Sequence, residues 1–211
     1  MDRSKQTADI FDKYALAYQD KYMDLHLYED SLEKFCNELE KKKARILEIG
    51  CGPGNITKVL LKKRPDLKIL GIDLAPQMIH LAKINNPEAE FMVMDCREIA
   101  ELDRKFDAVV CGFCLPYLSK NDSLRLIDNI SELLNSRGLF YLSTMEARHN
   151  RSGYVGSSSG EENLYTWYHE AEYLRAHIKK NNFELLALSR IENPVYLDNS
   201  IKDLLILAKK S

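Results

Sequence analysis

Apolar and polar residues follow each other along the chain in a pattern that predicts strands and helices in alternation. Short apolar runs of β-prone residues, typical of buried strands, cover residues 45–49, 68–73, 90–94 and 106–111. Helical spacing of apolar residues separates them, as at Ile56, Val59 and Leu60 after the first run. Strands that alternate with helices predict a mostly parallel, doubly wound α/β sheet of the Rossmann-like kind.

The second half of the chain continues this pattern and then departs from it. Leu124, Ile127, Ile130 and Leu134 predict a helical core face, and Gly138 leads into a further strand, LFYLST. A helix predicted over 169–180 is followed by two apolar stretches, FELLALSRI and DLLILAKK, joined by a short polar loop. Because a parallel connection needs a dozen or more residues, these two stretches should pair antiparallel. The sheet should therefore have seven strands, with an antiparallel last strand.

Two regions lie outside this core pattern. Near the amino terminus, Phe11, Tyr14, Tyr18 and Tyr22 have the spacing of an aromatic stripe on one helix. A second helix is predicted over 30–42, where Asp30 and Glu33 match a capping box. The glycine-containing stretch 146–165 lacks periodicity, so we expect a structureless loop, and long loops of this kind are often functional.

Length, charge and cysteine content exclude several classes of protein. The chain of 211 residues suits one α/β domain, and its net charge of −2 offers no basic field for nucleic acid. The charged amino terminus has no signal-peptide core, and no apolar run approaches the roughly 20 residues that span a bilayer. Five cysteines, an odd number, favour reduced thiols. We expect a soluble, cytoplasmic protein with no membrane or nucleic-acid partner.

The stretch LEIGCGPGN, residues 47–55, carries the clearest chemistry. Glycines at every second position after a strand allow a ligand to approach the backbone and the following helix N-terminus closely. No G-K-[ST] follows, which excludes a P-loop, and Asn55 stands where the dinucleotide fingerprint has glycine or alanine. Glu48 would repel a pyrophosphate and attract a cation. The loop therefore favours a ligand that is cationic near the glycines, such as S-adenosylmethionine.

The loop matches an E/D-x-G-x-G-x-G motif through Glu48-Ile49-Gly50-Cys51-Gly52-Pro53-Gly54. On this motif the sequence resembles the class I S-adenosylmethionine-dependent methyltransferases. The resemblance implies one domain over 1–211, with an N-terminal helical lid over 1–43 and a substrate-binding insertion over 146–168. It implies S-adenosylmethionine as cofactor and S-adenosylhomocysteine as product. The cofactor-binding residues that it implies are Glu48, Gly50, Cys51, Gly52, Gly54, Asp73, Leu74, Met78, Asp95, Cys96, Cys111, Gly112 and Phe113. Tyr14 and Tyr18, from the aromatic stripe near the amino terminus, are further candidates that would close over the sulfonium.

The catalytic residues and the acceptor are less constrained. His169 is the best candidate for a general base, because it lies between the insertion and a predicted helix, and Tyr117 is a candidate at the pocket wall. Cys111 and Cys114 form a C-x-x-C, but no further ligands complete a zinc site, so we expect packing and no metal. The acceptor should be a small molecule. An NAD(P)-dependent oxidoreductase and a non-catalytic S-adenosylmethionine-binding module remain alternatives, and the oligomeric state is open.

Overall fold

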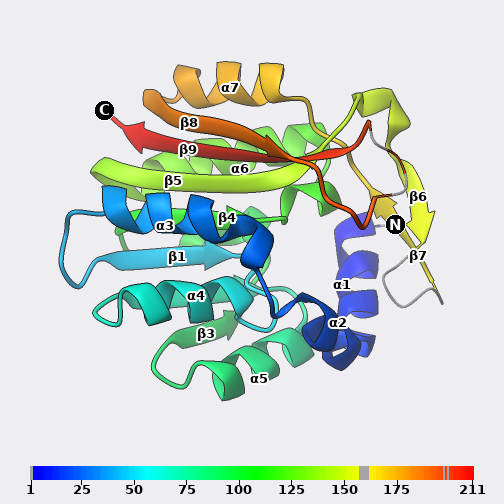
Figure 1. Cartoon of the computed structure of the whole chain (residues 1–211), viewed down its shortest axis with the longest axis horizontal. Coiled ribbons are helices and arrows are strands. Elements are labelled where there is room, and N and C mark those ends of the chain that lie inside the picture. Colours follow the sequence, from blue (N-terminus) through cyan, green and yellow to red (C-terminus); the bar gives the residue numbers. More distant parts are fainter. Residues whose placement is uncertain (1, 157–161, 197, 199) are drawn as a thin grey trace.

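The computed structural model describes residues 2–156, 162–196, 198 and 200–211. Its centre is a seven-stranded sheet, and five neighbouring strands at one side of it are parallel (Figure 1). The last strand pairs antiparallel with both of its neighbours, as the short polar loop before it predicts. In spatial order the strands are β3 (Glu90–Val93), β2 (Lys68–Asp73), β1 (Arg45–Ile49), β4 (Phe106–Gly112), β5 (Leu134–Glu146), β9 (Lys202–Lys210) and β8 (Phe183–Ile191).

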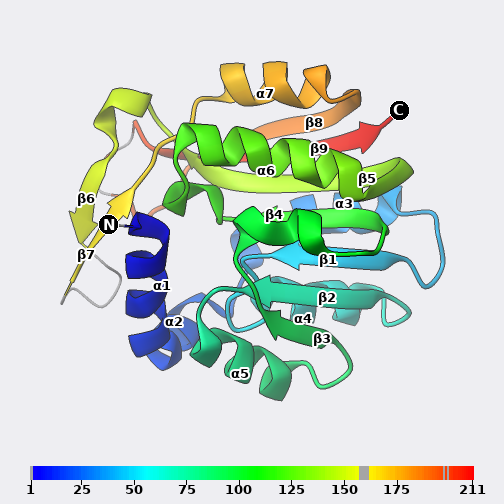
Figure 2. The same cartoon turned by 180° about the vertical axis from the view of Figure 1, so that it is seen from behind.

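Helices cover both faces of the sheet, as a doubly wound fold requires (Figures 1 and 2). On one face, α3 (Glu29–Glu38) and α4 (Asn55–Lys63) bury Phe35 and Leu60 against the strands. On the other face, α6 (Lys120–Leu133) and α7 (Ala171–Lys180) do the same with other aliphatic side chains. A further helix, α5 (Pro76–Asn85), packs beside β3. The predicted fold class and its seven strands are confirmed.

The amino-terminal segment lies across the carboxyl ends of the parallel strands (Figures 1 and 2). It comprises α1 (Arg3–Lys13), α2 (Ala15–Tyr22) and the short 3-10 helix η1 (His26–Tyr28). The expected single aromatic helix is wrong, because the backbone leaves helical geometry at Tyr14. The expected capping box is also wrong: α3 begins at Glu29 and has no side-chain cap. Ligands at this edge of the sheet would meet the first two helices directly.

The stretch after β5 is more ordered than its sequence predicts. A 3-10 turn, η4 (His149–Arg151), leads into the hairpin of β6 (Gly153–Gly156) and β7 (Asn163–Thr166). Residues 157–161 of the expected loop lie outside the described part of the chain. The hairpin gains its order from cross-strand aromatic packing, such as Tyr154 on Tyr165, and from the guanidinium of Arg3 in α1, 4.0 Å from the centre of the Tyr165 ring.

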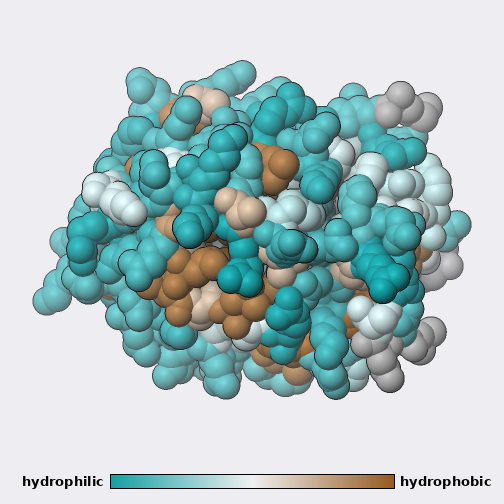
Figure 3. All heavy atoms as spheres, turned by 90° about the horizontal axis from the view of Figure 1, so that it is seen from above, coloured by the Kyte–Doolittle hydropathy of each residue, from teal (hydrophilic) through white to brown (hydrophobic). Residues whose placement is uncertain are grey.

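The far edge of the sheet is β8, whose residues 185–188 are only partly buried. Figure 3 views the molecule from the side of α7 and β8, and it shows a hydrophobic area within a largely hydrophilic surface. In the described residues, no helix combines the length and the apolar character needed to cross a membrane.

Candidate functional site

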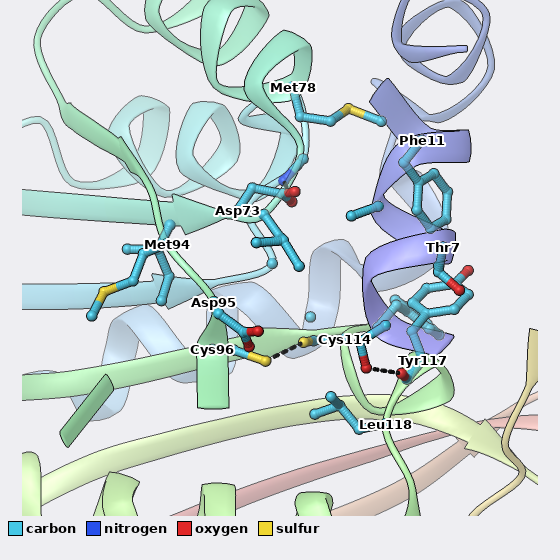
Figure 4. A pocket seen from close by; sticks show the side chains of 18 of the residues that line it. Thr7, Phe11, Asp73, Met78, Met94, Asp95, Cys96, Cys114, Tyr117 and Leu118 are labelled. Carbon is cyan, nitrogen blue, oxygen red and sulfur yellow. Dashed lines mark hydrogen bonds between the residues drawn. The ribbon is translucent and has the colours of Figure 1, made fainter. Parts of the chain in front are cut away.

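A cleft of about 730 Å³, counting space open to solvent, lies where β1, β2 and β4 end. In Figure 4, Asp73 and Asp95 come from the strand ends on one side, and Thr7 and Phe11 of α1 stand opposite them. The carboxyl ends of the strands thus form the floor of a pocket, and the amino-terminal helix forms its wall.

The glycine loop divides into two parts with different roles. Gly50 and Gly52 line the cleft with φ of +67° and +52°, a backbone conformation that glycine adopts without strain. Gly54, with φ of +81°, does not line it; a Cβ there would come within 2.3 Å of Asn86 Nδ2. The third glycine therefore allows α4 to begin close to α5. Asn55 donates to the backbone oxygen of Tyr22 (3.0 Å), so its side chain connects the loop to α2.

Glu48 lies behind this loop and is 1% exposed. The hydroxyl of Thr57, in the first turn of α4, donates to its Oε2, whereas Oε1 has no hydrogen-bond partner among the described residues. Burial raises the pKa of Glu48 to about 8. Since an unpaired buried carboxyl oxygen is costly, a cationic donor at this position would stabilise the ionised form. The carboxyl group itself is not part of the cleft lining, so contact with a ligand would need local movement or a water.

Asp73 and Asp95 bring two carboxylates to the cleft. Asp73, at the end of β2, accepts backbone hydrogen bonds from Gly52 and Ala75, each of 2.9 Å, and burial raises its pKa. Asp95 precedes the 3-10 helix η2 (Cys96–Glu101) and accepts from the backbone nitrogen of Arg97 at 2.9 Å. Because a carboxylate offers about four acceptor positions, Asp73 can still accept from hydroxyl or amino donors in the cleft. Asp95 also accepts from the guanidinium of Arg97 through both oxygens, which leaves it about one further acceptor position.

The end of β4 forms the cleft floor. Gly112 and Phe113 line it, and Phe113 has φ of +50°, which is unusual for a bulky residue. Hydrogen bonds from its backbone nitrogen to the carbonyl and hydroxyl oxygens of Ser143 hold this conformation. Cys111 is fully buried and does not reach the cleft, whereas Cys114 lines it, 3.8 Å from the sulfur of Cys96.

Three tyrosines were expected at the cleft, and two line it. Tyr18 lies over the glycine loop, and Tyr117, in the 3-10 helix η3 (Leu115–Tyr117), packs edge-on against Phe11. Burial raises the pKa of both hydroxyls, which keeps them protonated at neutral pH. Tyr14 points elsewhere: its hydroxyl donates to Glu162 beside the hairpin. The break at Tyr14 thus separates it from the face of the helix that carries Phe11.

The structure argues against His169 as the general base. Its side chain has no exposed surface; Nε2 lies 2.8 Å from the carbonyl oxygen of Leu115, and Nδ1 hydrogen-bonds the hydroxyl of Tyr173. Burial lowers its pKa to about 4, so the ring is neutral. His169 also lies before the first residue of α7 and is not part of that helix. Its backbone forms an isolated parallel β-bridge with Glu146. Both ring nitrogens are used in holding η3 and α7 together.

Most of the expected cofactor residues line this one cleft. Those brought together are Tyr18, Gly50, Gly52, Asp73, Leu74, Met78, Asp95, Cys96, Gly112 and Phe113, with Tyr117 beside them. Tyr14, Glu48, Cys51, Gly54 and Cys111 lie behind or beyond the lining. The expected helical lid also contributes side chains that were not among the predicted site residues: α1 supplies Ser4, Thr7 and Ala8 in addition to Phe11. The apolar spacing around Phe11 was the only available signal for this face.

Comparison with known proteins agrees with the geometry. Residues 46–138 match the methyltransferase domain family. A malonyl-[acyl-carrier protein] O-methyltransferase of Acetivibrio thermocellus is 37% identical over 106 residues, 49% of this chain and 36% of that protein. The chain covers less than half the length of this and two further curated relatives.

Two solved structures share the fold along nearly the whole chain. Magnesium protoporphyrin IX methyltransferase of Synechocystis PCC 6803, with bound S-adenosylmethionine, has a TM-score of 0.76 at 15% identity and covers 100% of this chain and 98% of its own. An S-adenosylmethionine-dependent methyltransferase of Clostridium acetobutylicum has a TM-score of 0.73 at 16% identity, with coverage of 96% and 99%. Residues 46–138 of this chain are therefore similar to the methyltransferase domain family, and the whole chain shares the fold of these two S-adenosylmethionine-dependent methyltransferases.

Proposed function

We propose that the protein transfers a methyl group from S-adenosylmethionine to a small-molecule acceptor. The observation that carries this proposal is the buried Glu48 carboxyl behind the glycine loop, with one oxygen unpaired among the described residues. A phosphate-bearing ligand at that loop would meet an acidic group. An amino acid ammonium, which is the methionine end of S-adenosylmethionine, would supply the missing donor through local movement or a bridging water, because the carboxyl group does not line the cleft.

The remaining residues fit the other parts of this cofactor. We propose that Asp73, which lines the cleft, accepts hydrogen bonds from the ribose hydroxyls and that Asp95 accepts one from the adenine amino group. Leu74 and Met78 provide apolar surface beside the adenine position. When bound, S-adenosylmethionine supplies an electrophilic methyl group on a sulfonium. The match of the acidic and apolar groups to its three parts supports the proposal.

The chain contributes alignment and exclusion of water. Phe11, Tyr18 and Tyr117 cover the cleft with aromatic surface, which favours loss of charge at a sulfonium. The described lining residues include no histidine or lysine, the tyrosine hydroxyls stay protonated, and the two carboxyl groups, Asp73 and Asp95, are assigned above to the ribose and the adenine. We therefore propose that the acceptor reaches the site already nucleophilic and that the protein supplies no general base.

A second hollow lies next to the cofactor residues. It measures about 410 Å³, counting space open to solvent, shares Tyr18, Gly52 and Phe113 with the cleft, and has Tyr28 and Tyr141 on its wall. No charged side chain is among its described lining residues. A small acceptor with an uncharged aromatic or apolar part suits these walls. Because the five cysteines are free, we also propose the cytoplasm as the location.

A methyl-transfer assay tests the enzymatic part of the proposal. The purified protein is incubated with methyl-labelled S-adenosylmethionine and a panel of small carboxylic acids, phenols and amines. Formation of S-adenosylhomocysteine with labelled product supports a methyltransferase. Tight binding of S-adenosylhomocysteine without transfer to any acceptor in the panel would favour the non-catalytic binding module.

The oxidoreductase alternative has less support in the structure. Dinucleotide loops need glycine or alanine where Asn55 stands, and here that side chain is committed to the backbone of Tyr22. A small residue at this position would lose the connection to α2. The same contact leaves the loop suited to a ligand covered by the amino-terminal helices.

A further inference from the structure

One arginine joins the two walls of the cofactor cleft. The Nε of Arg97 lies 3.0 Å from both carboxylate oxygens of Asp95, and one terminal nitrogen lies 2.5 Å from Oδ2. The same guanidinium also reaches Asp2, at 2.7 and 3.2 Å. Arg97 therefore holds two carboxylates that are 93 positions apart in the sequence.

The two carboxylates belong to opposite walls of the cleft. Asp95 lines it from the strand side. Asp2 is the N-cap of α1, since its Oδ1 accepts from the backbone nitrogen of Ser4 at 3.0 Å. Ser4 and Phe11 of α1 line the cleft from the other side, and the hydroxyl of Ser4 donates to the backbone oxygen of Tyr117. The guanidinium thus connects the start of the lid helix to the expected adenine acceptor.

We propose that Arg97 is a positioning residue that orients Asp95 toward the adenine amino group and couples cofactor binding to closure of α1. This inference rests on the proposed function. A planar guanidinium bound through two nitrogens fixes the plane of the Asp95 carboxylate, which a single-point contact would leave free to rotate. The remaining acceptor position of Asp95 then points in a defined direction.

Arg97 forms two ion pairs, one with Asp95 (the Asp95 arm) and one with Asp2 (the Asp2 arm). They differ in solvent exposure, and this difference decides which ion pair opens. The Asp95 side chain is 13% exposed, whereas Asp2 is 44% and Arg97 itself 31% exposed. Solvent screens the Asp2 arm more strongly, so it is the weaker one. Opening of α1 should break the Asp2 contact and leave the Asp95 contact in place. Arg97 would then keep the adenine site ordered while the lid moves.

Base discrimination tests the Asp95 arm. Calorimetry compares S-adenosylhomocysteine with the analogue in which a carbonyl oxygen replaces the adenine amino group. The wild type should prefer the amino form, and Arg97→Ala should reduce that preference about tenfold, the scale of one charge-assisted hydrogen bond. Arg97→Lys keeps the charge and loses the planar contact, so its preference should be intermediate. Arg125→Ala, which removes an exposed arginine paired with Asp122, is the matched control and should retain the wild-type ratio.

The rate of ligand release tests the Asp2 arm, which connects Arg97 to α1. Asp2→Asn keeps a capping side chain but loses the ion pair. Stopped-flow measurement should show S-adenosylhomocysteine leaving this variant several-fold faster, with the amino preference unchanged, and high salt should remove most of the difference. An unchanged preference in Arg97→Ala and Arg97→Lys, or an unchanged release rate in Asp2→Asn, would overturn the inference. If the wild type binds no S-adenosylhomocysteine, it is the proposed function that fails.

Discussion

Replacing Glu48 by glutamine tests the electrostatics of the site. The two side chains have the same shape, and Thr57 can donate to either one, but glutamine cannot ionise. Burial raises the pKa of Glu48 to about 8, so the carboxyl group is mostly protonated in the free protein at neutral pH. In the unfolded chain the same group has a pKa of about 4.3.

The sign of the effect follows from these two pKa values. The folded state holds the proton more tightly, so the contribution of Glu48 to stability is fully present below about pH 4.3 and is lost as the pH rises to about 8. One pH unit corresponds to about 1.4 kcal/mol, so the wild type should lose about 3 kcal/mol between pH 5 and 7.5 through this group. Glu48→Gln should lose none of it. Any fixed cost of burying the amide is independent of pH and cancels in this comparison.

Urea unfolding of both proteins between pH 5 and 8 measures this difference, with the exposed Glu88→Gln variant as control. The free energy of unfolding of Glu48→Gln should rise relative to wild type as the pH increases. In the same variant S-adenosylhomocysteine should bind at least about tenfold more weakly, because a buried charge partner of its ammonium is lost. A difference in unfolding free energy that stays constant from pH 5 to 8, with unchanged binding, would refute the role assigned to Glu48.

Three further substitutions test other parts of the account. Asp73→Ala should weaken S-adenosylhomocysteine binding about 10- to 100-fold by calorimetry, whereas the exposed Asp103→Ala should not change it. His169→Ala should lower the free energy of unfolding by about 2–4 kcal/mol in urea and leave S-adenosylhomocysteine affinity within about twofold, because the buried ring holds structure and no ligand. Asp203→Asn should lower the melting temperature by several degrees, since the buried carboxylate accepts from the Tyr28 hydroxyl at 2.6 Å.

The fold could be predicted because its core pattern is local. The spacing of apolar residues predicts each strand and helix of the sheet region. The loop after Ile191 is too short for a parallel connection, so the next strand has to pair antiparallel. The hairpin of β6 and β7 could not be predicted in this way. Its order depends on aromatic pairs and on Arg3, which is more than 150 residues away in the sequence.

In the candidate site, too, residues whose role follows from local sequence could be predicted, and residues whose role depends on distant contacts could not. Asp73 and Asp95 were identifiable because both end or follow a parallel strand, and parallel strands end at one edge of the sheet. His169 looked like a base because its position beside the insertion is visible in sequence, whereas its burial against Leu115 is not. Arg97 and Asp2 gave no sequence signal, since their meaning depends on how α1 docks.

Binding titrations of the wild-type protein with S-adenosylhomocysteine, and separately with NAD and NADP, test most directly the central claim that the cleft binds S-adenosylmethionine. The carboxyl groups at the ends of β1 and β2, with Asn55 in the loop, predict one S-adenosylhomocysteine per chain and no measurable binding of either dinucleotide. Binding of NAD or NADP without binding of S-adenosylhomocysteine would contradict the account.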